Sequence, residues 1–397
     1  MNTGDQKVAV IGGCGHVGLP LGIVFANLGF PTTLIDINQD SVDLVNSGRM
    51  PFMEDGSDEA LGAALKSGNL LASTDMSEIA KHDILIVTIG TPVDDHQSPV
   101  PRVFLDFIDS IWNYLHAGQL IVLRSTVFPG TSNWVAEKLS KIGVDVAFCP
   151  ERIVQGKALV ELQTLPQIVS GSSPLAVSRA EELFKSMTPQ IVHASMREAE
   201  FAKLFLNAYR YIQFAVTNEF FMLTNDAGVD YDEVRRVMTE GYERAAGFPK
   251  AGLAAGPCLL KDTQQLLAFG QNNFHIGNSA ILVNEGLALY LIEAASKLIK
   301  LENATVGILG MAFKANNDDI RASLSYRVRK MLQMRASKVL SSDPFVKNDS
   351  TLITVEELIE NSDIIIICTP HDIYKNLDFK DKPIVDVWNT QGNGLLI

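Results

Sequence analysis

Three glycines at the spacing G-x-G-x-x-G constrain this chain more than any other feature of its sequence. The loop Gly13-Cys14-Gly15-His16-Val17-Gly18 follows the apolar run Val8 to Ile11 and precedes a helical pattern. In this context the first glycine permits a tight turn, the second lets backbone amides approach a phosphate, and the third allows a helix to pack closely on a strand. The chain is therefore expected to begin with a doubly wound α/β domain that binds a dinucleotide.

A carboxylate at the end of the next predicted strand indicates which dinucleotide is bound. Asp36 comes 18 residues after Gly18 and ends an apolar run, and no Lys or Arg follows it before Arg49. The carboxylate would accept hydrogen bonds from a ribose 2′-hydroxyl and repel a 2′-phosphate, which favours NAD over NADP. A Rossmann-like turn without a nucleotide is the alternative, and the strand–loop–helix context disfavours it. The residues assigned to the cofactor are Gly13, Gly15, His16, Val17, Gly18 and Asp36.

Two side chains within the glycine loop could carry chemistry of their own. Cys14 and His16 occupy the variable positions of the motif. We interpret both as occupants of these positions, and not as redox or catalytic groups.

The alternation of strand and helix patterns divides the chain into three parts. Short apolar strands separated by helices continue to about residue 190, which indicates a largely parallel sheet covered on both faces. Residues 196–227 contain no Gly or Pro and predict a helix about 45 Å long, followed by further helices. Strands return after residue 300. The expected fold is α/β, with two Rossmann-like doubly wound domains joined by a central all-helical region, divided as 1–190, 191–300 and 301–397.

Composition excludes several functional classes. The 33 Lys and Arg against 46 Asp and Glu give a net charge of −13, which argues against a general nucleic-acid binder. No uninterrupted apolar run approaches the roughly 18 residues of a membrane span, and the segment Met1–Asp5 lacks the pattern of a secretory signal. Four cysteines in 397 residues do not make a disulfide framework. We expect a cytoplasmic protein with no nucleic-acid partner, no membrane association and no metal site.

Polar residues recur on one face of the predicted 196–227 helix. Their spacings of 3, 4, 3 and 8 put them on a common face beside an apolar one; they are Glu200, Lys203, Asn207, Arg210 and Asn218. A solvated face with ion pairs would give the same pattern. A helix between two α/β domains should be partly covered, however, so the polar face is interpreted as lining a cleft.

The segment Gly256-Pro257-Cys258-Leu259-Leu260-Lys261-Asp262 is the strongest candidate for a reactive centre. Proline favours the first position of a helix, so the helix is predicted to start at Pro257 with Cys258 in its first turn. The helix dipole there favours a thiolate, and Asp262 lies four residues on, on the same face. The alternative is that Cys258 is a buried small hydrophobe, as free cysteines usually are. The other three cysteines are interpreted as structural.

In order along the chain, these motifs resemble the nucleotide-sugar 6-dehydrogenase family, which includes the UDP-glucose and GDP-mannose dehydrogenases. The resemblance covers nearly the whole chain. Beyond the glycine loop and Asp36, the matching motifs are Gly90-Thr91-Pro92, Ser125-Thr126-Val127, Pro150-Glu151-Arg152, Glu200-x-x-Lys203-x-x-x-Asn207, Cys258-x-x-Lys261-Asp262, Gly310-Met311-Ala312-Phe313-Lys314, Asp318-Asp319-x-Arg321-x-Ser323 and Asp343-Pro344.

The resemblance implies an NAD-dependent, four-electron oxidation of the C6 hydroxyl of a nucleotide-linked hexose, of the kind used in polysaccharide biosynthesis. Cys258 would hold the aldehyde as a thiohemiacetal and then as a thioester. Water would hydrolyse the thioester with the help of Glu151. The first alkoxide and its proton would be managed by Lys203, Asn207 and a water near Thr126 and Asp262.

The resemblance also implies which residues contact the substrate and which subunits cooperate. Thr91 and Thr126 join the cofactor residues. Lys314 and Arg321 would lie near the phosphates or the sugar, and Arg244 would reach the substrate of a neighbouring subunit. The long helix would form much of a dimer core, so a homodimer or larger homo-oligomer is expected. The full set of expected substrate contacts is Glu151, Arg152, Lys203, Asn207, Arg210, Arg244, Lys314 and Arg321.

The identity of the hexose is left between close alternatives. The segment Pro150–Ile153 followed by Gly156-Lys157-Ala158 looks like the branch that oxidises UDP-N-acetylhexosamines, so UDP-N-acetylmannosamine or UDP-N-acetylglucosamine is expected and UDP-glucose is the alternative. Gln155 and Ala255-Gly256-Pro257 depart from the family pattern. A two-electron hydroxyacid dehydrogenase of the 6-phosphogluconate type would leave residues 303–390 unexplained, and a non-catalytic nucleotide-sugar-binding protein is the remaining alternative.

Overall fold

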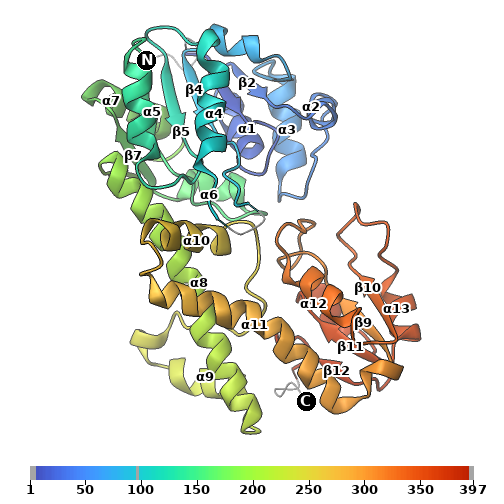
Figure 1. Cartoon of the computed structure of the whole chain (residues 1–397). Helices are drawn as coiled ribbons and strands as arrows, with labels where there is room; N and C mark the ends of the chain where they lie inside the picture. Colours follow the sequence, from blue (N-terminus) through green and yellow to red (C-terminus); the bar gives the residue numbers. More distant parts are fainter. Residues whose placement is uncertain (1–5, 95–97, 393–397) are drawn as a thin grey trace. The chain divides into compact units, whose positions relative to one another are not determined.

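The computed structural model describes residues 6–94 and 98–392. The chain divides into two compact units, residues 1–206 and 207–397, and each is described by itself. The division falls within helix α8 (Met196–Asp226), which Figure 1 draws in green. Residues 1–5, on which the expectation about a secretory signal depends, lie outside the described residues.

The first unit is built on an eight-stranded sheet in the order β3-β2-β1-β4-β5-β6-β7-β8. Strands β1 to β6 pair in parallel, as the apolar runs predict. Strand β7 departs from that pattern, because it pairs antiparallel with β6. The strands are β1 (Val8–Ile11), β2 (Thr32–Ile35), β3 (Leu70–Ser73), β4 (Ile84–Val87), β5 (Leu120–Leu123), β6 (Asp145–Phe148), β7 (Gln167–Gly171) and β8 (Ile191–His193).

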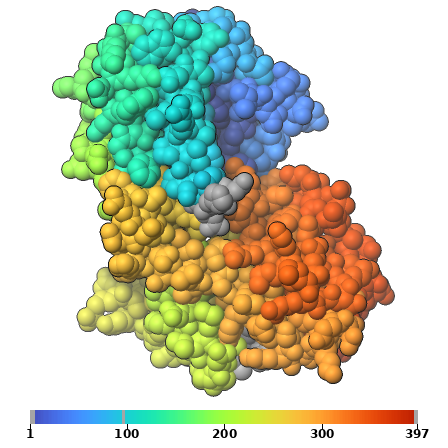
Figure 2. Space-filling view, viewed as in Figure 1, coloured from blue at the N-terminus to red at the C-terminus, as the bar shows by residue number. Residues whose placement is uncertain are grey.

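Helices cover both faces of this sheet (Figure 1). Alternate strand residues point to opposite faces, and Val8 and Val10 accordingly belong to one buried cluster while Ala9 and Ile11 belong to another. On the face shown in Figure 2, teal and blue segments form the outer surface of this unit, with a darker blue segment recessed between them. The helices are α1 (Gly18–Asn27), α2 (Gln39–Asn46), α3 (Ser57–Lys66), α4 (Pro101–Ile111), α5 (Thr131–Ser140), α6 (Ala158–Thr164) and α7 (Pro174–Lys185).

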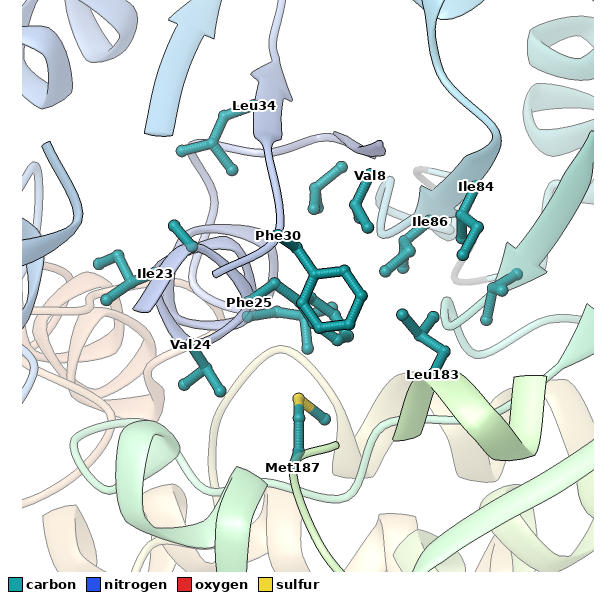
Figure 3. Packing of buried hydrophobic residues seen from close by; sticks show 14 of the residues in the cluster. Val8, Ile23, Val24, Phe25, Phe30, Leu34, Ile84, Ile86, Leu183 and Met187 are labelled. Atoms are coloured by element: carbon teal, nitrogen blue, oxygen red, sulfur yellow. The ribbon is translucent and has the colours of Figure 1, made fainter. Parts of the chain in front are cut away.

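The first of these clusters holds α1 against the sheet, behind the glycine loop. Phe25 on α1 packs edge-on against Phe30, with ring centroids 5.5 Å apart. Leu183 and Met187, from α7 and the turn after it, close the same cluster (Figure 3). Burying large side chains of this kind contributes roughly 1.5–3 kcal/mol each, so the start of α1 is fixed on a rigid base.

The second unit begins with helices and ends in a smaller α/β fold. The four-stranded sheet has the order β10-β9-β11-β12, with all pairs parallel. The expected class, two Rossmann-like folds joined by a helical region with a long connecting helix, is confirmed. The elements are α9 (Tyr231–Thr239), α10 (Leu259–Phe269), α11 (His275–Leu298), β9 (Thr305–Leu309), α12 (Leu324–Leu332), β10 (Lys338–Ser342), α13 (Val355–Asn361), β11 (Ile364–Ile367) and β12 (Ile384–Val385).

Helix α11 is the one helix of the described residues that is long and apolar enough, by length and composition alone, to cross a membrane. The search for uninterrupted apolar runs did not detect it, because polar residues are scattered along its length. Its side chains Leu287, Leu291 and Ile292 are buried in a cluster with Val306 of β9 and Ile364 of β11. We therefore interpret α11 as a core helix of the second unit.

Candidate active site

The glycine loop connects β1 to α1 and leaves room only for glycine at two of its positions. A Cβ on Gly13 would lie 2.6 Å from the carbonyl oxygen of Val10, and one on Gly18 would lie 2.4 Å from that of Gly12. At Gly15 the nearest atom would be 3.4 Å away, so the space beside this glycine is open. A loop that is tight on its protein side and open on the other, at the start of a helix, is suited to binding a pyrophosphate.

Asp36 lies beside this loop at the end of β2. Its carboxylate accepts hydrogen bonds from the backbone amides of Cys14, at 3.0 Å, and Asn38, at 3.1 Å. Each carboxylate oxygen has a second lone pair, so Asp36 can still accept from ribose hydroxyls. The loop and the acid therefore fit an NAD adenosine and its pyrophosphate.

The two other polar side chains of the loop have packing roles. Cys14 is buried, and burial, followed by the charge of Asp36, raises the pKa of its thiol to about 12. The ring of His16 packs on Phe52, with centroids 3.9 Å apart. A thiol with so high a pKa is a poor nucleophile at neutral pH, in agreement with its interpretation as an occupant of a variable position.

The ends of β4 and β5 bring the two predicted threonines together. The Thr91 hydroxyl donates to the backbone carbonyl of Thr126 at 2.6 Å, and the neighbouring Ser125 hydroxyl donates to Ile89 at 2.7 Å. Both threonine side chains are half-buried. These bonds join two strand ends at the carboxyl edge of the sheet, where doubly wound folds bind ligands.

Glu151 is held in a buried ionic cluster. One carboxylate oxygen accepts from the backbone amides of Arg152, at 2.7 Å, and Ile153, at 3.1 Å. The other pairs with the guanidinium of Arg124, which is fully buried and also donates to Gln167. Burial lowers the pKa of Arg124 to about 10. A glutamate bound on both oxygens is fixed in place, so its first role in the fold is to orient the loop after β6.

Arg152 turns away from that carboxylate. Its guanidinium donates to the backbone carbonyl of Pro166, and burial lowers the pKa of the side chain. The next turn of the loop is fixed by Glu54, which accepts from the amides of Gly156 and Ala158 at 2.8 and 2.6 Å. Carboxylates thus set the shape of the whole 151–158 segment.

The polar face of α8 separates into residues with different roles. Glu200 is buried and accepts from the amides of Gly130, at 2.6 Å, and Ser132, at 2.8 Å, so it caps the N-terminus of α5. Arg210 is exposed and Asn218 is fully buried. The expectation that this face as a whole lines a cleft therefore needs correction. Glu200 and Asn218 are directed toward neighbouring parts of the fold and bind backbone groups there.

Asn207 and Asp262 form the polar centre of the second unit. The Asn207 amide donates to the Asp262 carboxylate at 2.6 Å, and both side chains are buried. The ammonium of Lys261 lies 3.5 Å from the other carboxylate oxygen. Lys203 is one helical turn before Asn207 on α8 and is half-buried. Buried and paired polar groups of this kind supply the fixed dipoles and proton acceptors that stabilise a developing oxyanion.

Cys258 is exposed at the start of α10, unlike the other three cysteines. The helix begins at Leu259, with Cys258 as its N-cap residue. The predicted start at Pro257 is wrong by two residues, because Gly256 is held outside the helix with φ of +108° and donates its amide to the carbonyl of Ala322 at 3.2 Å. The thiol still lies at the positive end of the helix dipole, and Asp262 follows one turn later.

Arg321 lies close enough to Cys258 for their charges to interact. Its guanidinium makes a fork with the Asp319 carboxylate, with bonds of 2.6 to 3.1 Å. Burial by itself lowers the pKa of Arg321, but the Asp319 carboxylate outweighs burial and the pKa is raised. Lys314 is half-buried in the same loop after β9. Arg244 is exposed elsewhere in this unit, and its guanidinium stacks on Tyr242 at 5.1 Å.

Two residues of this region were not singled out from the sequence. Arg124 directly precedes Ser125 at the end of β5, and a charged residue at the end of a buried apolar strand was the available signal. The sequence places Asn218 only on the polar face of the helix. The chemistry that the second unit can support is nucleophilic attack by a thiol next to an amide, a carboxylate and two cationic side chains.

Comparisons with known proteins identify relatives over the full length of the chain. Three domain models of the UDP-glucose/GDP-mannose dehydrogenase family match in succession: the NAD binding domain at residues 6–188, the central domain at 197–285 and the UDP binding domain at 307–392. A UDP-N-acetyl-D-mannosamine dehydrogenase of Methanocaldococcus jannaschii is 30% identical over 95% of this chain and 88% of its own length.

Two solved structures are similar in fold. A UDP-D-ManNAc dehydrogenase from Pyrococcus horikoshii superposes with a TM-score of 0.91 at 27% identity, covering 98% of this chain and 97% of its own. A UDP-glucose dehydrogenase from Pyrobaculum islandicum superposes with a TM-score of 0.90 at 28% identity, covering 97% and 95%. The similarity extends through both α/β folds and the helices between them.

Proposed function

The chain belongs to the UDP-glucose/GDP-mannose dehydrogenase family, and we propose that it oxidises the C6 hydroxyl of a UDP-hexose to a carboxylate with two NAD+. The observation that carries this proposal is the exposed Cys258 at the start of α10, one helical turn from the buried pair of Asn207 and Asp262. An oxidation that passes through an aldehyde needs a nucleophile to retain it between the two steps. Cys258 is the one exposed cysteine of the four.

The residues divide the reaction between them. Asp262 accepts the proton of the C6 hydroxyl through a water, and the Lys203 ammonium with the Asn207 amide stabilises the alkoxide. NAD+ held by the glycine loop and Asp36 would supply the hydride acceptor for each of the two oxidation steps. The Cys258 thiol adds to the aldehyde to give a thiohemiacetal, whose oxidation gives a thioester. Water then releases the carboxylate and restores the thiol, while Glu151 fixes the shape of its own 151–158 loop.

We propose three functional regions along the chain. Residues 1–190 bind NAD through Gly13, Gly15, Gly18 and Asp36, with Thr91 and Thr126 at the nicotinamide end. Residues 191–300 provide the catalytic side chains and the dimer contact. Residues 301–397 bind the UDP moiety, and Lys314 and Arg321 contact its phosphates or the sugar, because they are the cationic side chains of the loop after β9.

The proposed substrate is UDP-N-acetylmannosamine or UDP-N-acetylglucosamine. The named similarity to UDP-N-acetyl-D-mannosamine dehydrogenases over the full length supports this choice. UDP-glucose is the second candidate, because a UDP-glucose dehydrogenase is nearly as similar in structure. We propose a cytoplasmic enzyme, since NAD and UDP-sugars are both cytoplasmic metabolites.

A screen of NADH production across UDP-sugars, with mass analysis of the product, tests the proposed reaction. Two NADH per sugar and a uronate product are expected with a UDP-N-acetylhexosamine. One NADH per sugar would instead identify a two-electron dehydrogenase. Binding of UDP-sugar without any NADH would identify a non-catalytic binding protein.

Replacement of the nucleophile separates the two oxidation steps. Cys258→Ser is expected to permit the first oxidation and to stall afterwards, because a serine hydroxyl is a weaker nucleophile and an ester leaves less readily than a thioester. Intact-protein mass and NADH yield per enzyme are measured together with Cys14→Ser, Cys149→Ser and Cys368→Ser as controls. Full uronate production by Cys258→Ser would exclude the thioester.

We propose that α8 forms the centre of a homodimer. Tyr209, Val216, Phe220 and Leu223 are exposed large apolar side chains on this helix, and their spacings of 7, 4 and 3 fit a heptad seam. Phe221, by contrast, is buried in the core of its own unit. In this proposal Arg244 reaches the partner's substrate. Leu223→Glu should give a monomer in light scattering, and an unchanged dimer would exclude this contact.

A further inference from the structure

The chain reaches Cys258 through a buried segment that has no regular secondary structure. Residues 251–257 lie between the helices, and the side chains of Ala251, Leu253 and Ala254 are at most 5% exposed. A buried segment of this kind has to find partners for its backbone amides and carbonyls outside a helix or sheet. Those partners determine where the segment ends, and it ends at Cys258.

The side chain of Asn218 on α8 meets both polar groups of one residue of this segment. Its carbonyl oxygen accepts from the Gly252 amide at 2.9 Å, and its amide donates to the Gly252 carbonyl at 3.0 Å. The same amide donates to Asn284 on α11 at 2.9 Å, and Asn284 donates to the carbonyl of Tyr211 at 2.9 Å. Asn218 and Asn284 are fully buried, so each bond is made away from water, where leaving it unmade is costly.

Trp388 closes the other side of Gly252. A Cβ added to Gly252 would lie 2.1 Å from the indole ring, so the backbone rests directly on the ring face. The indole is itself fixed, because its N–H donates to the carbonyl of Cys368 at 2.9 Å. Gly252 is thus held between an amide side chain of the helical region and an aromatic ring of the turn after β12.

A second attachment follows four residues later. Gly256 donates its amide to the carbonyl of Ala322, and a Cβ on Gly256 would lie 2.8 Å from the ring of Phe313. Three residues lie between the two attachments, and one residue, Pro257, lies between the second attachment and Cys258. Over so short a distance a change at Gly252 is transmitted along the chain, because the intervening side chains are packed in the core.

We propose that Asn218 is a positioning residue for Cys258, which fixes the register of the 251–257 segment and thereby the place of the thiol at the start of α10. The consequence for turnover rests on the proposed function; the consequence for the segment does not. Misplacement of a reacting group by about 1 Å can cost on the order of 100-fold in rate. Loss of the Asn218 contacts should therefore slow the trapping of the aldehyde more than it weakens substrate binding.

The test compares Asn218→Ala with Asn225→Ala in the full-length protein. Asn225 lies two turns further along α8, is also buried, and donates to the hydroxyl of Tyr290 at 2.9 Å. Hydrogen exchange is followed in a peptide covering residues 253–258, which excludes the Gly252 amide. NADH formation is measured alongside, with a hydroxylamine present to capture escaped aldehyde.

Asn218→Ala is expected to raise exchange in 253–258 by about tenfold or more, to lower kcat by roughly 30- to 100-fold with KM changed less than about threefold, and to release aldehyde. Asn225→Ala should leave all three unchanged. If Asn218→Ala does not fold, Trp388→Leu releases the same residue from its other side and should give the same pattern. Unchanged exchange in 253–258 overturns the inference, and so does raised exchange with an unchanged kcat.

The two proposals fail in distinguishable ways. If the unmodified protein makes no NADH with any UDP-sugar, the proposed reaction is wrong, while the exchange of residues 253–258 still decides the role of Asn218. If the unmodified protein makes two NADH per sugar and the Asn218→Ala protein exchanges and turns over like it, only the positioning role is wrong.

Discussion

The four cysteines illustrate how surroundings divide one residue type into different chemical roles. Cys14, Cys149 and Cys368 are buried, and burial raises the pKa of each thiol to about 12. Cys258 is exposed at a helix N-terminus. Since only the thiolate is nucleophilic, the three buried thiols are almost entirely protonated and unreactive at pH 8.

We therefore expect iodoacetamide at pH 8 to label the native protein once, at Cys258. Raising the pH to 9.5 should add no label at the buried positions, because that pH is still well below a pKa of about 12. Intact mass and peptide mapping give the number and the site of the labels. Labelling of Cys14 or Cys149 before Cys258 in folded protein would contradict the roles assigned here.

Asp36 decides the cofactor at the scale of a single carboxylate. It is anchored by the amides of Cys14 and Asn38, so it meets a 2′ substituent with a fixed negative charge. Asp36→Ala should weaken the binding of NAD+ by about 10- to 100-fold, which corresponds to the loss of a hydrogen bond to a charged group. It should also reduce the preference for NAD+ over NADP+. The ratio of kcat/KM for the two cofactors is the measurement. Equal use of NAD+ and NADP+ by the unmodified protein would contradict this role of Asp36.

Among the elements, α8 combines roles that its sequence pattern could not separate. Its first turns carry Glu200, whose carboxylate caps α5 with bonds of 2.6 and 2.8 Å. A buried carboxylate at a helix N-terminus is favoured by both hydrogen bonding and the helix dipole. Later turns carry Asn207 and Asn218, which face α10 and the cysteine segment.

Glu200→Gln should lower the free energy of unfolding by about 2 kcal/mol, because one of the two amides of α5 then faces an NH2 group. Glu198→Gln, on the same helix, is the control: its exposed side chain accepts from the Ser195 amide, which the remaining carbonyl oxygen of Gln can still accept, so a much smaller effect is expected. Urea denaturation at neutral pH gives both values. Equal losses for the two variants would show that the cap contributes nothing beyond general helix electrostatics.

The elements also show what a sequence can predict. The Gly-free, Pro-free stretch 196–227 predicts α8 to within one residue, and the apolar run Val8 to Ile11 coincides with β1. Edge strand β10 (Lys338–Ser342) was not predicted, because its polar residues break the apolar pattern of a buried strand. The spacing of apolar residues indicates which side chains are buried, and an edge strand buries fewer side chains than a central strand.

The candidate site follows the same division. Short-range motifs located Cys258 and Asp262, whose relation is set by one helix. The contacts that hold Glu151 and the cysteine segment join residues 27 positions apart, Arg124 to Glu151, and 34 positions apart, Asn218 to Gly252. Such pairs depend on how elements pack, and no spacing in the sequence encodes them.

On the scale of the whole molecule, one turn design occurs in both α/β folds. Asp36 follows β2 and accepts from an amide of the loop after β1. Asp343 follows β10 and accepts from the amides of Met311 and Ala312, after β9, at 2.7 and 2.9 Å. In the second fold the buried His371 fills the space beside the acid. Its Nδ1 accepts from a backbone amide, so Nε2 carries the proton that is donated to Asp343. The space beside the acid is thus available to a dinucleotide in the first fold, and the His371 side chain occupies it in the second.

The position of α8 across two units leads to a prediction about fragments. The sequence predicts that the NAD-binding domain ends near residue 190. Strand β8, the buried Met196 and Ala199, and the Glu200 cap make contacts within the first compact unit, beyond that residue. A fragment of residues 1–190 loses these contacts and a fragment of residues 1–206 keeps them. We expect the longer fragment to be more stable by about 3 kcal/mol or more.

Both fragments should bind NAD+ when folded, because the glycine loop and Asp36 lie within them, and neither should oxidise a UDP-sugar, because Cys258 and Asp262 lie beyond both. Urea denaturation compares their stabilities, and calorimetric titration measures NAD+ binding.

Since binding of NAD+ stabilises the folded state by mass action, saturating cofactor should raise the unfolding midpoint of both fragments and leave the difference between them in place. Equal stability without cofactor would mean that the first turns of α8 are not part of the NAD-binding fold, and sugar oxidation by either fragment would mean that the nucleophile has been assigned to the wrong part of the chain.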